Sequence, residues 1–367
     1  ILGSHEKNKI YDTLRKNGNY KYNVENENEI FLVRRPHNKE VNSDNYKPCA
    51  NCKGYYSFKS LRQHYARCAS GTVETGRRNI LIKSRAIERK AHCRANTVLR
   101  DIVLPVMRED EVCKVVRYDE LAILLGNRLI VKFKSPHHYD MIRAKLRLIG
   151  RFLLALKSEG VEVQDFQDAL RPQRFDDAIK GINAVAGLRN GKYSSPATAF
   201  SLGLLLKDAT KLLITECIKK EDNQRKKNAQ DFLKLLESEL NASINKTVTE
   251  NWSERQRQKK VILPSREDIK ILITFLHKKR KRLVENLKET FSYHDWLELS
   301  KSTLVSILIF NRRRPGELER STIDDYNGYV KIDSLTNKEI YDPLSEEGKK
   351  CAREYVRYLI VMNEVSI

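Results

Sequence analysis

The segment "CANCKGYYSFKSLRQHYARC", residues Cys49 to Cys68, contains the most informative pattern of the chain. Two residues separate Cys49 from Cys52, eleven separate Cys52 from His64, and three separate His64 from Cys68. This spacing lets a knuckle supply two thiolates and one turn of a helix supply an imidazole and a third thiolate. Such a donor set is tetrahedral, and the cofactor it predicts is a structural Zn²⁺ ion.

Two further residues stand where a small metal-bound module keeps its core. Tyr56 lies four residues after Cys52, and Leu61 lies three residues before His64. With these residues the segment resembles a C2HC zinc finger of the ββα type. Because one finger reads only about 3 bp, base recognition and contact with a protein both remain open as its role.

The charge of the chain indicates an anionic partner. Its 367 residues include 69 Lys and Arg against 48 Asp and Glu, a net charge of +21. Nucleic acid is the first candidate, since each cation set against a phosphate releases counterions; an anionic membrane surface is the second. The longest apolar runs are far shorter than the roughly 20 residues that span a bilayer, so we expect no membrane insertion. The seven scattered cysteines indicate a reducing compartment, nucleus or cytosol, and no secretion.

The length predicts several domains of a mainly α fold. The clearest helix spans Ser135 to Gly160, with Ser135 as N-cap and Pro136 at the first helical position. A second begins at Ser265, which forms a capping box with Asp268. We expect the stretch 250–265, which has a basic part followed by Pro264, to interrupt the helical pattern. The expected domains are a polar leader with one short strand (1–48, the strand at 30–36), the ββα zinc finger (49–68), a linker (69–79), a helical domain (80–260) and a C-terminal domain (261–367).

The stretch "FNRRRPGELER", residues 310–320, concentrates cations directly after an apolar helix. Pro315 favours the start of a second helix there, which leaves Arg314 at the junction. One explanation is a helix-end ion pair between Arg314 and Glu317, with the other arginines solvated.

A wider comparison of motifs gives this stretch a second explanation. The Arg-x-x-Glu-Leu element, the following "STIDDY" and two strand-like runs, 328–334 and 337–344, resemble the opening of a tyrosine recombinase (phage integrase type) catalytic domain. The resemblance implies that Arg314 grips the scissile phosphate, that Glu317 orients it, and that Lys338 is the general acid toward the leaving 5′ oxygen. Arg312 and Arg313 would contact the DNA backbone. A last helix is expected from Glu346 to Asn363.

The segments 98–130 and 310–326 are also similar to recombinase-like proteins spread by mobile elements of the Crypton kind. That resemblance implies a helical domain of the core-binding kind, which clamps double-stranded DNA together with an α/β catalytic domain, and a homo-oligomer on DNA. The basic face it requires is found in Lys278, Lys279, Arg280, Lys281 and Arg282 and in "ERQRQKK", residues 254–260. For each basic run a merely solvated helix face is the alternative.

Strand cleavage in this family needs a His-x-x-Arg pair and a tyrosine nucleophile. No histidine follows His294. The chain as printed is therefore expected to bind DNA without cutting it, either as the N-terminal part of a longer DNA recombinase, which the missing Met and abrupt end favour, or as a degenerate copy. The alternative from another class is a non-catalytic zinc-finger DNA-binding or chromatin-associated regulator. An RNA-binding or purely structural helical protein is weaker, because the chain lacks an RNP-like aromatic strand pattern.

Overall fold

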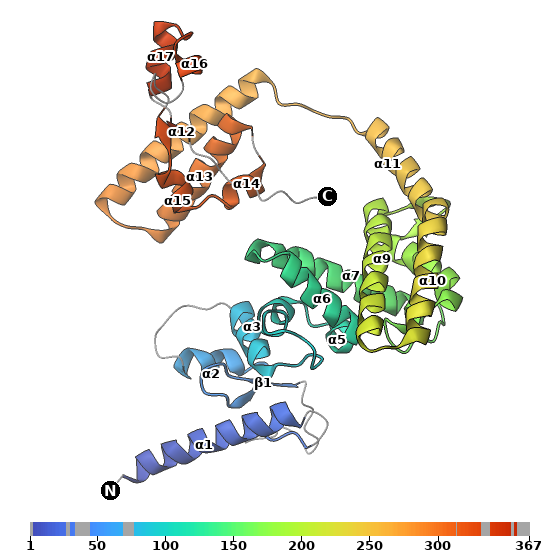
Figure 1. Cartoon of the computed structure of the whole chain (residues 1–367). Helices are drawn as coiled ribbons and strands as arrows, with labels where there is room; N and C mark the ends of the chain where they lie inside the picture. The colour runs from blue at the N-terminus through green and yellow to red at the C-terminus, as the bar shows by residue number, and fades with distance from the viewer. Residues whose placement is uncertain are drawn as a thin grey trace. The chain divides into compact units, whose positions relative to one another are not determined.

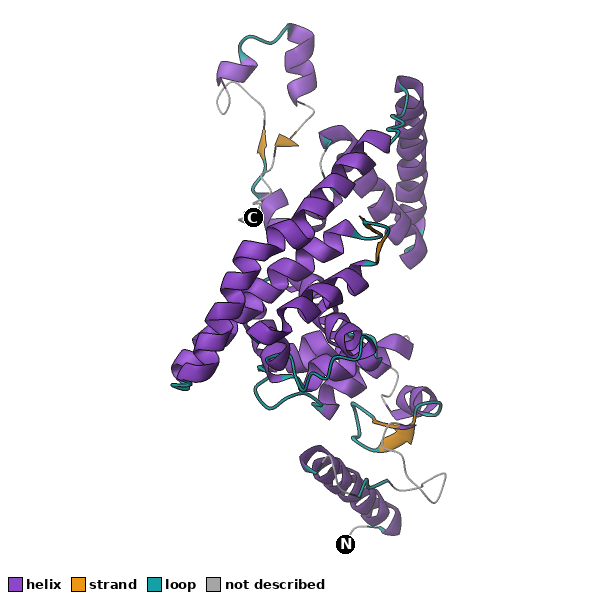
Figure 2. Cartoon of the chain, turned by 90° about the vertical axis from the view of Figure 1, so that its right-hand side faces the viewer, coloured by secondary structure: helices purple, strands orange, loops and turns teal. Residues whose placement is uncertain are grey.

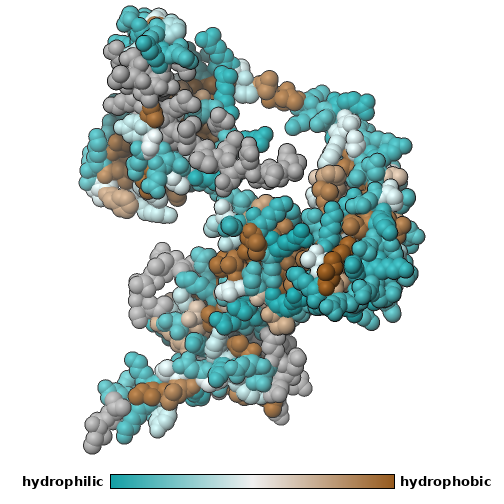
Figure 3. All heavy atoms as spheres, viewed as in Figure 1, coloured by the Kyte–Doolittle hydropathy of each residue, from teal (hydrophilic) through white to brown (hydrophobic). Residues whose placement is uncertain are grey.

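The computed structural model describes residues 3–26, 30–33, 45–68, 77–312, 314–331, 338–353 and 356–357. The chain is mainly helical, as expected, and divides into two compact units, Ile1–Lys259 and Lys260–Ile367 (Figures 1 and 2). No helix in the described part of the chain is long and apolar enough to cross a bilayer. On the face shown in Figure 3, hydrophilic side chains cover most of the coloured surface.

The first unit begins with a long helix, α1 (Ser4–Glu25), where the sequence predicts a polar leader. The expected strand at 30–36 is wrong over Ile30–Val33, which is irregular; the rest of it lies outside the described residues. Asn23 explains the irregular path, because its amide Nδ2 donates to the Leu32 carbonyl (2.9 Å) and its Oδ1 accepts from the Leu32 N–H (2.8 Å). The Asn23 side chain thus forms the backbone hydrogen bonds of Leu32 that a neighbouring strand would otherwise provide.

A hairpin, one helix and a bracing helix follow. Strand β1 (Tyr46–Pro48) pairs antiparallel with β2 (Tyr55–Ser57), and α2 (Leu61–Cys68) completes a ββα order. Helix α3 (Arg77–Glu88) comes next, after residues 69–76, which lie outside the description.

The remainder of the first unit, called here the all-helical region, consists of helices and one short hairpin whose two strands have two residues each. Its elements are η2 (Leu99–Val103), α4 (Leu104–Val106), α5 (Glu111–Tyr118), α6 (Glu120–Lys132), η3 (Pro136–His138), α7 (Tyr139–Ser158), η4 (Asp168–Leu170), η5 (Pro172–Arg174), α8 (Phe175–Ala186), β3 (Leu188–Arg189), β4 (Lys192–Tyr193), α9 (Pro196–Lys219), α10 (Asn223–Leu240), η6 (Asn241–Asn245) and α11 (Lys246–Gln258). The expected helix from Ser135 to Gly160 is confirmed as η3 and α7, and Gly160 adopts the positive φ (75°) that favours glycine after a helix.

Helix α7 lies at the centre of the core of this region. Phe152 on α7 is fully buried and packs edge to face against Phe166, with ring centroids 6.4 Å apart. Gly150 allows α5 to approach closely: a Cβ atom there would lie 2.7 Å from the carbonyl oxygen of Val112. The apolar period of α7 and this one small residue together set the distance between the two helices.

The expected interruption at residues 250–265 is wrong in its first part: residues 259–265 are irregular, but residues 250–258 are helical. Helix α11 continues to Gln258, because its residues still reach the core. Buried Asn251 accepts a hydrogen bond from the Tyr193 N–H (2.7 Å), and Trp252 packs against Phe200 at 5.7 Å between ring centroids. The helix thus carries the first arginines of the basic stretch.

The second unit is built on a pair of helices. Ser265 and Asp268 form the expected capping box, in which Ser265 Oγ accepts from the Asp268 N–H (3.1 Å) and Asp268 Oδ2 accepts from the Ser265 N–H (2.9 Å). Leu276 and Leu283 form the buried face of the first helix. The elements are α12 (Arg266–Glu289), α13 (Tyr293–Asn311), α14 (Pro315–Glu319), α15 (Ile323–Asn327), β5 (Val330–Lys331), α16 (Lys338–Tyr341), α17 (Glu346–Arg353) and β6 (Val356–Arg357).

The predicted strand pair at 328–334 and 337–344 is wrong in its second member. Strand β5 pairs antiparallel with β6, with Val330 opposite Arg357, while residues 338–341 form the short helix α16. The helix expected from Glu346 to Asn363 ends at Arg353 in α17. A β-branched residue, Val356, starts the strand that follows, which agrees with the preference of such residues for strands.

Candidate metal centre and basic surfaces

Four side chains meet at the junction of the hairpin and α2. The ligand atoms of Cys49, Cys52, His64 and Cys68 all lie within 4.8 Å of one another. Cys52 Sγ is 3.2 Å from His64 Nε2. This cluster can hold a metal ion, and all four of its donors come from one ββα module, which is the arrangement of a closed structural site.

The backbone of the knuckle between the strands brings the first two thiols together. The Cys49 N–H donates to the Gly54 carbonyl (2.9 Å), and the Lys53 N–H donates to the Cys49 carbonyl (2.8 Å). Lys53 adopts a positive φ of 58°, which turns the chain back toward β2. Two residues between the cysteines are the number that this turn requires.

Helix α2 presents the other two donors, His64 and Cys68, one turn apart on the same face. The ring of Tyr56 stacks on the His64 ring, with centroids 3.7 Å apart and planes at 16°. The Asn51 amide Nδ2 donates to the Cys68 carbonyl (2.7 Å) and Sγ (3.2 Å). Contacts of this kind orient metal ligands and are a common feature of structural sites.

The thiols of the cluster interact strongly. A hydrogen bond from Cys49 lowers the pKa of Cys52 to about 4, whereas the same hydrogen bond and burial raise the pKa of Cys49. One thiol therefore ionises readily while its neighbour keeps the proton. A dication among these donors would take the place of that proton, since Zn²⁺ binds thiolates. Three sulfur donors and one imidazole nitrogen fit zinc better than the oxygen-preferring cations.

Helix α3 completes the core of the metal module. Buried Cys49, Leu61 and Ile80 form one apolar cluster, and Ile80 belongs to α3. Lys47 of β1 is paired with Glu88 of α3, its Nζ 3.1 Å from both carboxylate oxygens, and the two side chains are only 11% and 6% exposed. The module and α3 therefore form one packed body.

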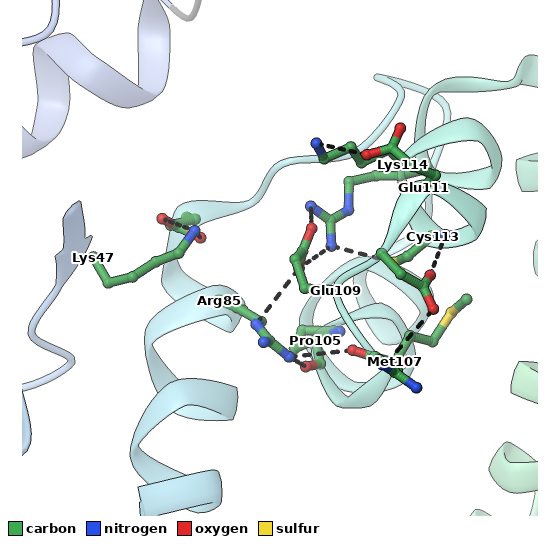
Figure 4. Close-up of polar contacts among 12 residues, drawn as sticks. Lys47, Arg85, Pro105, Met107, Glu109, Glu111, Cys113 and Lys114 are labelled. Atoms are coloured by element: carbon green, nitrogen blue, oxygen red, sulfur yellow. Dashed lines mark hydrogen bonds and ion pairs between the residues drawn. The ribbon is translucent and has the colours of Figure 1, made fainter. Parts of the chain in front are cut away.

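The same helix also contacts the all-helical region (Figure 4). Arg85 on α3 donates to the carbonyls of Pro105 (3.2 Å) and Met107 (3.1 Å) and lies 3.5 Å from the carboxylate of Glu109. Arg117 on α5 pairs with Glu109 at 2.9 Å. Burial acts to raise the pKa of Glu109, but the two arginines outweigh it and lower that pKa. Sequence reasoning missed this network, because nothing local marks Arg85 as the partner of residues that lie 20 to 24 positions further along the chain.

The arginine stretch lies at the junction between α13 and α14. Arg314 is the exposed N-cap of α14, and the Glu317 N–H donates to its carbonyl (3.0 Å). Among the described residues no ion pair joins the two side chains; the contact between them is this backbone one. Arg312 is exposed with a positive φ of 53°, Lys338 is the exposed first residue of α16, and Arg313 lies outside the described residues.

The basic run on α12 divides into two sets. Lys279 pairs with Glu298 on α13 (2.7 Å), and Arg280 is half-buried. Lys278, Lys281 and Arg282 are exposed, and within the described ranges no carboxylate oxygen lies within 4.0 Å of their charged nitrogens. The helical period places these three on the side of α12 opposite Leu276 and Leu283.

Comparison with protein-family models, with curated proteins and with solved structures gives no match for this chain. The metal module, the charged surfaces and the sequence motifs are therefore what bears on its function.

Proposed function

We propose that the chain is a double-stranded DNA-binding protein with kinship to the tyrosine recombinases, held together at its N-terminal end by a structural Zn²⁺ ion. The observation that carries the proposal is the outward face of α12, where Lys278, Lys281 and Arg282 present three charges with no carboxylate oxygen within 4.0 Å among the described residues. These three cations form no ion pair within the described residues, and the chain as a whole has a net charge of +21. Such side chains are suited to contact with phosphate groups.

In this proposal the arginine stretch serves the same DNA. Arg314 binds the scissile phosphate, Glu317 orients it, Lys338 acts as the general acid, and Arg312 with Arg313 contacts the backbone. The exposure of Arg314 supports this, because its guanidinium is accessible and can bind a phosphate through two hydrogen bonds. In the same proposal the protein binds DNA in the nucleus as a homo-oligomer.

A second candidate is a regulator that binds DNA without cutting it. The observation that favours it is that Arg314 and Glu317 contact each other through their backbones, with no ion pair between them in the described part of the chain. Comparing Arg314→Ala with Arg312→Ala separates the two. A specific phosphate site predicts the larger loss of duplex affinity for Arg314→Ala, whereas equal losses indicate a diffuse basic patch.

Duplex binding is tested by fluorescence anisotropy across a salt series. The variant K278A/K281A/R282A is compared with K114A/K180A/K234A, which removes three lysines paired with acids one helical turn away and so removes the same charge. The slope of log Kd against log salt should fall by about 1 for each phosphate-binding cation that is removed. Equal slopes for the two triple variants would contradict the proposal.

Metal binding is tested by elemental analysis and by Co²⁺ substitution. One zinc per chain is expected, with the visible absorption of tetrahedral cobalt thiolate when Co²⁺ replaces it. Cys68→Ser should remove most of the metal, whereas Cys93→Ser changes an exposed cysteine outside the cluster and should keep it. Full zinc content in Cys68→Ser would rule out the site.

A further inference from the structure

The corner between α6 and α7 gathers cations around one aromatic ring. Phe133, the C-cap of α6, has Lys132 Nζ 5.3 Å from its ring centroid and Lys145 Nζ, from α7, 5.9 Å from it. The ring of His138 packs against Phe133, with centroids 5.1 Å apart. Lys134 adds a further exposed charge in the connecting loop.

Within the described part of the chain, these lysines contribute no ion pair to the fold. Among the residues that the structure describes, no carboxylate oxygen lies within 4.0 Å of Lys132, Lys134 or Lys145. Some other cations of the same region are paired; Arg94, for example, binds both Glu120 (2.8 Å) and Glu216 (2.7 Å).

Helix electrostatics explains only part of this cluster. Lys132 lies in the last turn of α6, where the helix dipole favours a cation. That reason does not apply to Lys145, which lies in the second turn of α7. Each ammonium group makes a cation–π contact with the Phe133 ring, and such a contact compensates only part of its charge. A bound anion would compensate the rest.

We propose that this corner is a second contact with the sugar–phosphate backbone of duplex DNA, made by Lys132, Lys134 and Lys145. The inference deepens the proposed function and rests on it. Two ammonium groups, each within 6 Å of the same ring centroid, are close enough to reach neighbouring phosphates of one strand, which follow one another at about 3.4 Å along the axis. Ammonium groups are point charges that suit phosphate without reading sequence.

The burial of Phe133 favours a duplex over a single strand. Proteins that bind single strands stack bases on open aromatic faces. The Phe133 ring is half-buried, and its faces are taken up by Lys132, Lys145 and His138. The corner therefore offers charge without a stacking platform.

The experiment uses the full chain and a labelled duplex of random sequence. K132A/K134A/K145A is compared with the charge-matched K114A/K180A/K234A, and both are checked by circular dichroism for unchanged helix content. At 0.1 M salt, Kd should rise at least about tenfold for the corner variant, with a salt slope lower by about 3. The control should differ little from the wild type. In Phe133→Leu, which keeps every charge, Kd should rise less while the slope stays near the wild-type value.

The outcomes distinguish the inference from the proposed function. If the wild type shows no salt-dependent duplex binding, both are wrong. If it binds, and K278A/K281A/R282A weakens it while the corner variant matches its control, the inference alone is overturned. Competition with poly-glutamate and with single-stranded DNA of equal length completes the test: an effect of the corner variant on either competitor but not on the duplex would also overturn it.

Discussion

Replacing Lys47 by alanine tests the link between the metal module and α3. At 3.1 Å and an effective dielectric constant near 20, the attraction between Lys47 and Glu88 is about 5 kcal/mol before the cost of removing both groups from water. Removing one partner of such a pair leaves a buried charge and typically costs about 3–5 kcal/mol. We expect about 3 kcal/mol, at the lower end of this range, because Lys47 keeps some exposure.

The assay is urea unfolding of the Co²⁺-loaded protein, followed by the visible absorption of the metal centre. This signal measures the unfolding of the metal module separately from the rest of the chain. The control is K47M/E88L, in which two apolar side chains replace the pair and stability should return to within about 1 kcal/mol of the wild type. A loss below about 0.5 kcal/mol in Lys47→Ala, or a double variant as unstable as the single one, would refute the reasoning.

The remaining predictions concern the helical parts. Gly150→Ala should cost about 1–3 kcal/mol in chemical denaturation, since its new methyl group meets a backbone oxygen at 2.7 Å, whereas Gly316→Ala, with nothing within 4 Å, should cost almost nothing. A hydrogen bond from Arg94 lowers the pKa of Glu120 to about 2, below the usual 4.5. The stabilisation of the fold by ionised Glu120 is therefore complete above pH 4.5 and is lost as the pH falls toward 2. The melting temperature of Glu120→Gln should depend less on pH in that window than the melting temperature of the wild type does. Ser265→Ala should destabilise the second unit by about 1 kcal/mol in urea, because the cap of α12 is removed.

The sequence predicts most accurately those parts whose signals are local. The spacing of Cys49 and Cys52 and of His64 and Cys68 was enough to predict a cluster that can hold a metal. The Ser265 cap and the apolar period from Ser135 to Gly160 likewise correspond to observed elements. Each signal lies within a short stretch of chain, so no tertiary contact was needed to recognise it.

The parts that depend on distant partners were predicted poorly. Lys47 gives no hint in sequence that it pairs with Glu88, and α1 has too few apolar residues to show a period. In the second unit, β5 finds its partner at β6 rather than in the adjoining run, because strand pairing is decided by the whole surface and not by proximity along the chain. The catalytic roles assigned to Arg314 and Lys338 remain predictions.

The cluster of Cys49, Leu61 and Ile80 has a consequence for any attempt to isolate the zinc-binding part. A peptide that ended at Cys68, the last donor, would keep every ligand but lack Ile80, the side chain of α3 that packs against Cys49 and Leu61. Such a peptide should take up metal weakly and exchange it fast. Extending the peptide to Glu88 restores both Ile80 and the carboxylate that pairs with Lys47. The smallest fragment expected to fold on its own therefore includes α3 and does not end at the last metal ligand.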